Sequence, residues 1–138
     1  MKFIVRDTDY AVRALVYMAK QSLSKNKKVF TVDEVVREEG LPGRFLRKLL
    51  QTLAKRGLLV SNKGKKGGFS FLKPPASIKL TDIMEVFQGR VDITNCLLKG
   101  RPCPNKKKCI LRKTLKNINK LIQRELEKIT VVSLLEGR

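Results

Sequence analysis

The sequence has 138 residues, with 31 Lys and Arg against 12 Asp and Glu, which gives a formal net charge of +19. This length fits one domain, and 42% hydrophobic residues can form its core, so disorder throughout is excluded. No apolar run approaches the roughly 20 residues that cross a bilayer, and the N-terminus becomes charged too early for a signal peptide. We therefore expect a cytoplasmic protein without a membrane partner.

The residue types give little support to an enzyme. The chain has no His, so nucleophile–His pairs and His-ligated metal sites are excluded. The glycines of residues 64–68 do not follow the phosphate-binding spacing GxxxxGK[ST]. We expect a protein that is not an enzyme and has no small-molecule substrate. The strong positive charge favours nucleic acid as the partner, with a membrane surface or plain solubility as alternative reasons for the charge.

The first helix is predicted over residues 9–22, where apolar residues recur at helical spacing. Thr8 or Asp9 could cap its N-terminus. The Lys-rich residues 24–28 indicate a loop after this helix.

A helix, a tight turn and another helix are predicted next. Thr31 and Glu34 fit a capping box that begins a helix over residues 32–39. Gly40 suits the left-handed residue that ends this helix, and Pro42 suits the first turn of the following helix. That third helix has a basic outer face and an inward apolar stripe, which consists of Phe45, Leu46, Leu49, Leu50 and Leu53.

Residues 58–61 and 69–72 are predicted to form a β-hairpin. Its loop contains Lys63, Lys65 and Lys66 among three glycines, so the tip is cationic. Glycines allow the positive φ angles of tight hairpins and a close approach to a phosphate backbone.

Two further helices are predicted, a short one over residues 78–88 and a long one from about residue 111 to residue 129. A helix of about 20 residues is roughly 30 Å long, more than a domain of this size can cover. Pairing of the long helix with a second copy of the chain is the economical solution, and folding back onto its own domain is the alternative.

The predicted fold is mainly α with a small β-hairpin. It comprises a winged helix-turn-helix region over residues 1–76, followed by residues 77–138 with a loop at about 90–110 and a long C-terminal dimerisation helix. In such a domain the third helix enters the major groove of double-stranded DNA, and the hairpin reaches phosphates or the minor groove. The predicted DNA contacts are Pro42, Gly43, Arg44, Arg47, Lys48, Lys63, Gly64, Lys65, Lys66 and Gly67. A basic RNA-binding protein is the alternative, although the chain lacks a base-stacking aromatic platform.

Three cysteines, Cys96, Cys103 and Cys109, lie within fourteen positions of a polar, Lys-rich segment. Their odd number argues against a structural disulfide framework, and their surroundings are not those of core residues. Structural zinc usually has more closely spaced pairs and four ligands. The residues alone leave open an iron–sulfur cluster, redox-active thiols without a cluster, or zinc.

The order of these segments resembles the Rrf2 family of winged-helix transcription regulators. The most specific similarities are residues 8–15, the hairpin over residues 58–69 and the three spaced cysteines. The resemblance implies a DNA-binding homodimer, joined through the long final helix, whose operator affinity depends on a [2Fe-2S] or [4Fe-4S] cluster. It further implies that Cys96, Cys103 and Cys109 ligate this cluster.

The resemblance also bears on a fourth, non-thiolate ligand. Some relatives place a His shortly after the third Cys, where this chain has Arg112. In a nitric-oxide-sensing branch, an Asp near the start of the first helix ligates the cluster from the other subunit. Asp9 matches that position, with Asp7 as the second choice, and a helix cap is the alternative role of Asp9. In the recognition helix, Arg44, Phe45 and Arg47 replace Ser, Tyr and Glu of relatives, so those relatives' operators do not transfer.

Overall fold

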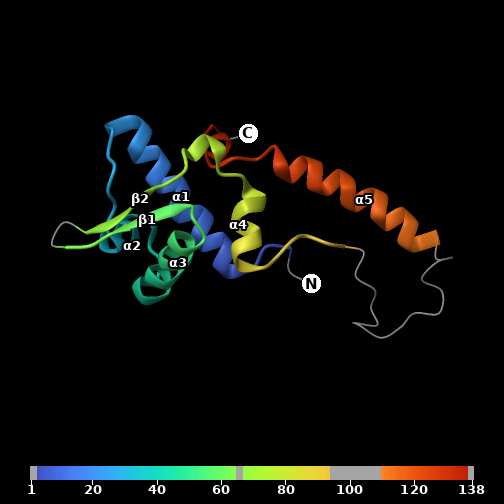
Figure 1. The fold of residues 1–138 in the computed structure, drawn as a ribbon, viewed down its shortest axis with the longest axis horizontal. Coiled ribbons are helices and arrows are strands. Elements are labelled where there is room, and N and C mark those ends of the chain that lie inside the picture. The colour runs from blue at the N-terminus through green and yellow to red at the C-terminus, as the bar shows by residue number, and fades with distance from the viewer. Residues whose placement is uncertain (1–2, 65–66, 94–109, 137–138) are drawn as a thin grey trace.

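The computed structural model describes residues 3–64, 67–93 and 110–136. Helices dominate the fold, and one two-stranded antiparallel sheet protrudes from it (Figure 1). The elements in chain order are α1 (Arg6–Lys25), α2 (Val32–Glu39), α3 (Gly43–Lys55), β1 (Leu59–Asn62), β2 (Gly68–Phe71), the 3-10 helix η1 (Pro75–Ser77), α4 (Leu80–Phe87), α5 (Ile110–Glu127) and α6 (Val131–Leu135). This confirms the predicted class, mainly α with a small hairpin.

Helix α1 begins three residues earlier than predicted, so the capping roles suggested for Thr8 and Asp9 are wrong. Val5 is the N-cap residue, and no side chain caps this end. Thr8 is instead fully buried inside the helix, where its hydroxyl donates a hydrogen bond of 2.8 Å to Oε1 of Gln88. A contact with a residue 80 positions away therefore decides where α1 begins.

The predicted turn between α2 and α3 is confirmed. The backbone amide of Glu34 donates to Oγ1 of Thr31 at 3.2 Å, and the Thr31 amide donates to Oε1 of Glu34 at 2.7 Å, which forms the capping box. Gly40 ends α2 with φ of 66°. Pro42 is the N-cap residue of α3 rather than a residue of its first turn.

The inward stripe of α3 is confirmed for its four Leu residues, which are buried, whereas Phe45 is only half-buried. The Phe45 ring packs edge-on against Tyr10 of α1, and the guanidinium of Arg6 lies 4.9 Å from its centre.

One hydrophobic core joins α1, α2, α3, the hairpin, α4 and α6. Its fully buried side chains include Leu15, Met18, Phe30, Leu46, Leu50, Leu53, Ile78, Ile83 and Val131. Residues far apart in the sequence, from α1 to α6, thus share one core with the buried leucines of α3.

Strands β1 and β2 pair with Leu59 opposite Phe71 and Asn62 opposite Gly68. The free edge of β2 is also occupied, because Phe30 and Phe69 exchange two backbone hydrogen bonds of 2.8 and 2.7 Å. The segment before α2 therefore fixes the position of the hairpin, which we call the wing.

The C-terminal region contains two helices where one was predicted. Helix α5 ends at Glu127, and the short helix α6 follows with Thr130 as its cap. The Val131 amide donates to the carbonyl of Ile78 at 3.0 Å, and Val131 enters the main core. The helix ends at Glu127 because the chain must change direction to bring Val131 into contact with Ile78 and the main core.

Most of α5 projects away from the body (Figure 1). Near its C-terminal end, Ile122 and Leu126 pack against Leu80 and Met84 of the α4 helix. Toward the other end, Ile110 is 80% and Leu111 66% exposed. Folding back onto its own domain therefore accounts for only part of the apolar face. In the described part of the chain, no helix is long and apolar enough to cross a membrane.

Candidate nucleic-acid interface

The outer face of α3 carries cations on a rigid support. Arg44, Arg47 and Lys48 are exposed, and the buried Leu46 and Leu50 fix the same helix in the core. Ion pairs between described residues involve none of these three cations. Their positive charge is therefore available to a polyanion.

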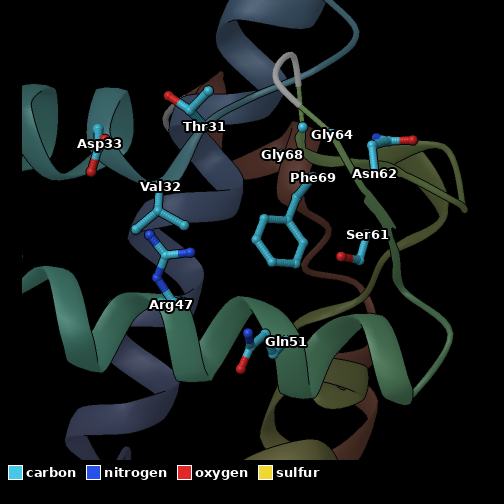
Figure 2. A pocket seen from close by; sticks show the side chains of 11 residues that line it. Thr31, Val32, Asp33, Arg47, Gln51, Ser61, Asn62, Gly64, Gly68 and Phe69 are labelled. Carbon is cyan, nitrogen blue, oxygen red and sulfur yellow. The ribbon is translucent and has the colours of Figure 1, made fainter.

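A polar hollow of about 310 Å³ separates α3 from the wing (Figure 2). Arg47 and Gln51 contribute to it from α3, and the start of α2 forms another wall. The complete lining is Thr31, Val32, Asp33, Arg47, Gln51, Ser61, Asn62, Gly64, Gly67, Gly68 and Phe69.

The predicted DNA contacts fall into three groups. Arg47, Gly64 and Gly67 meet at this hollow. Lys65 and Lys66 lie outside the described residues. The remaining five lie on the surface of α3, at its N-cap or in the wing, away from the lining of the hollow: Pro42, Gly43, Arg44, Lys48 and Lys63.

The wing glycines have structural reasons that the sequence pattern does not reveal. A Cβ atom at Gly68 would lie 2.3 Å from the carbonyl oxygen of Phe30, and one at Gly67 would lie 2.6 Å from that of Asn62. Gly64 has φ of 110°, which L side chains rarely adopt. These glycines are explained by the packing and turn of the wing without any contact to DNA.

Sequence reasoning did not assign five polar residues of the hollow to the site: Thr31, Asp33, Gln51, Ser61 and Asn62. Gln51 follows Arg47 by four positions, so helical spacing alone places it beside that cation. No sequence spacing places Ser61 and Asn62 of β1 in the hollow, because the approach of β1 to α3 depends on packing in the core.

The predicted metal ligands are only partly described. Cys96, Cys103 and Cys109 lie outside the described residues. Asp9 lies on α1, where its carboxylate pairs with Arg13 at 3.3 Å and its side chain is 45% exposed. Asp7 is half-buried in the first turn of the same helix. Neither Asp belongs to a cluster of three or more metal-binding side chains within the part that the structure describes.

The three-helical body, the basic α3 and the adjoining wing define a winged helix-turn-helix protein. Comparison with known folds agrees. CymR, the global cysteine regulator of B. subtilis, superposes with a TM-score of 0.80 at 20% identity over 100% of this chain and 99% of that chain. The T. potens IscR structure gives a TM-score of 0.74 at 22% identity, over 99% of this chain and 88% of that chain.

The chain belongs to the Rrf2 family, whose model, described as an iron-dependent transcriptional regulator, matches residues 4–137. An rrf2-like HTH-type transcriptional regulator of Rhodobacter capsulatus is 29% identical over 72% of this chain and 68% of its own length. An HTH-type transcriptional regulator of Aquifex aeolicus is 38% identical over 68% of this chain and 62% of its own length. The protein is therefore a transcriptional regulator and not an enzyme.

Proposed function

We propose that this regulator binds its operator as a homodimer, that α3 reads bases while the wing contacts phosphates, and that an iron–sulfur cluster controls the affinity. The observation that carries the DNA-binding mode is the basic face of α3 beside the wing, where Arg44, Arg47 and Lys48 form no ion pair with another described residue. Arg can donate two hydrogen bonds to a guanine edge, whereas Lys mostly neutralises phosphate charge.

Two variants test the division of labour on DNA. A duplex is first selected from a random library by the wild-type protein. Arg47→Ala should then lose about 1 to 3 kcal/mol of discrimination between the selected and a random duplex. The double change Lys65→Ala and Lys66→Ala should instead weaken binding to both duplexes alike. It should also flatten log affinity against log salt by roughly 0.9 for each phosphate that is no longer neutralised. Equal losses on both duplexes for Arg47→Ala would contradict base reading by α3.

The cluster is supported by the chemistry of the donor set. Three cysteines and no His offer thiolates, which iron–sulfur clusters prefer, and the family description names iron dependence. Asp9 could supply a carboxylate to the partner's cluster, because its side chain is partly exposed and does not cap helix α1. A bound cluster would supply redox-sensitive or nitric-oxide-sensitive ligation, and its gain or loss would shift the DNA-binding elements between two arrangements.

Anaerobic reconstitution tests the cluster. The wild type should absorb broadly at roughly 320 to 420 nm, and Ala at any one of the three cysteines should abolish this band. Asp9→Ala should shorten the cluster lifetime while costing at most about 1 kcal/mol of stability, since the Arg13 ion pair is exposed. An iron-free, colourless wild type whose operator affinity changes on thiol oxidation would identify the alternative, a cluster-free thiol switch of the same fold.

The homodimer is supported by the uncovered apolar face of α5. Ile110, Leu111, Ile118 and Leu121 are 80%, 66%, 41% and 58% exposed. Full burial of an exposed Ile or Leu side chain contributes about 1.5 to 3 kcal/mol, so each of these residues would contribute a part of that in proportion to its exposure. Dimerisation would also present two α3 helices to DNA, with half-sites about one helical turn, roughly 34 Å, or a multiple apart.

A further inference from the structure

We infer that the hollow between α3 and the wing holds one backbone phosphate of the bound DNA, and that the neutral side chains of Gln51 and Ser61 hydrogen-bond this phosphate. We call this position the phosphate seat. The inference rests on the proposed function, because the phosphate belongs to the duplex that α3 reads.

Gln51 and Ser61 mark the junction of helix and wing at the surface. Both side chains are exposed. Both line the hollow of about 310 Å³, and both also line a more open depression of about 630 Å³ on the other side, next to Lys55 and Val60. The two residues therefore lie where the two depressions meet. Gln51 is contributed by α3 and Ser61 by β1 (Figure 2).

Among the described residues, the side chains of Gln51 and Ser61 have hydrogen-bonding groups without a partner. Across residues 3–64, 67–93 and 110–136, the Gln51 amide and the Ser61 hydroxyl have no side-chain hydrogen-bond partner. Their neighbour Asn62 differs, because its Nδ2 donates to Oγ of Ser70 at 3.1 Å and so links the two wing strands. Gln51 and Ser61 thus have donors ready for a ligand.

The charges around the hollow favour an anion at this end. Arg47 precedes Gln51 by one helical turn and Lys55 follows it by one turn, and both are exposed. The carboxylate of Asp33 lies across the hollow, on α2 (Figure 2). An anion is attracted toward the cations of α3 and repelled from the α2 wall, which favours a position beside Gln51 and Ser61.

The location of the seat selects a phosphate rather than a base. If α3 occupies one groove and the wing approaches the adjacent groove, the strand that separates the grooves must pass over the junction between them. That strand presents its phosphates outward, while the base edges lie deeper, toward Arg44 and Arg47. Neutral donors to phosphate fix the register of a protein on DNA without releasing counterions.

Two substitutions test the seat on duplexes that are bound by the full-length protein. Gln51→Ala and Ser61→Ala are measured separately on the selected and the random duplex over a series of salt concentrations. Each substitution should weaken binding to both duplexes equally. For Gln51→Ala we expect a loss of about tenfold in affinity per subunit, which is the size typical of a lost hydrogen bond to a charged group. The slope of log affinity against log salt should stay unchanged, because no cation is removed.

Further variants separate the seat from a folding defect. Gln51→Glu keeps the size and helix propensity of the side chain but places a carboxylate beside the phosphate, so it should bind more weakly than Gln51→Ala. Gln21→Ala, which removes a half-buried amide on α1 outside the lining of the hollow, serves as the matched control and should bind like the wild type. The thermal midpoints of all variants should stay close to that of the wild type.

Each contrary result is distinct. Unchanged affinity of Gln51→Ala and Ser61→Ala overturns the seat alone. A loss confined to the selected duplex overturns it in favour of base reading by Gln51, and a flattened salt slope overturns it in favour of a displaced cation. A wild type that does not bind duplex DNA overturns the proposed function together with the seat.

Discussion

Gly68 is the wing residue with the least space for a side chain, since its Cβ would lie 2.3 Å from the backbone oxygen of Phe30. We expect Gly68→Ala to break the backbone pairing of Phe30 with Phe69 and to lower the free energy of unfolding by about 1 to 3 kcal/mol. Urea unfolding measures this loss. Gly43→Ala is the matched control, because its Cβ would meet Cγ2 of Val36 at an ordinary 3.6 Å. Equal stability of the two variants would contradict the close approach.

Tyr17 is a partly buried residue whose phenol has a shifted pKa. Burial raises the pKa of Tyr17 above its ordinary 10.0, and the nearby charges of Glu34 and Glu38 add to the rise. The folded state then holds the phenolic proton more tightly than the unfolded state, so stability falls as the pH rises above about 10.

We therefore predict a pH-dependent difference between the wild type and Tyr17→Phe. The variant has no phenol to ionise, so its stability relative to the wild type should rise between about pH 9 and pH 11. Denaturant unfolding at several pH values measures the difference, and the comparison cancels the titration of the many lysines. A difference that stays constant over this range would contradict a raised pKa.

At the scale of elements, Gln88 connects the end of α4 to the start of α1. Its Oε1 accepts from the Val5 amide at 3.1 Å and from the Thr8 hydroxyl at 2.8 Å, and its Nε2 donates to the carbonyl of Phe3 at 2.8 Å. This one side chain positions the segment that carries Asp7 and Asp9. Sequence periodicity could not reveal the connection, since it joins residues that are 80 or more positions apart.

Gln88→Leu should leave the buried Thr8 hydroxyl without its partner and cost about 1 to 3 kcal/mol of stability. Hydrogen exchange should accelerate at the first turn of α1 because the Val5 amide loses its acceptor as well. Adding Thr8→Val removes the unsatisfied hydroxyl, so the double variant should regain part of the loss. Strictly additive losses would show that the two side chains are not coupled.

At the scale of the whole molecule, the exposed apolar face of α5 predicts the assembly state. Charged replacements at Ile118 and Leu121, as Ile118→Glu with Leu121→Glu, should convert a dimer to monomers, because carboxylates cannot be buried unpaired in an apolar interface. Sedimentation equilibrium measures the mass. Lys116→Glu changes the opposite side of α5 and should leave the dimer intact. A double variant that remains dimeric would place the interface elsewhere.

Local chemistry within the sequence was enough to predict α2, the turn at Gly40 and the stripe of α3. The capping box joins residues three apart, and the buried leucines of α3 recur every three or four positions. Interactions of this kind close within one or two helical turns, so the order of residues alone specifies them. The same is true of the paired strands of the wing, which a short loop connects.

Only the tertiary structure decided how these elements meet. The start of α1 depends on Gln88, the break between α5 and α6 depends on Ile78, and Gly68 is required by Phe30. The junction of Gln51 with Ser61 likewise arises because the core holds β1 against α3. The sequence determined most of the elements and the basic character of α3, since those follow from neighbouring residues. The site that the elements form together required the long-range packing that orients one element against another.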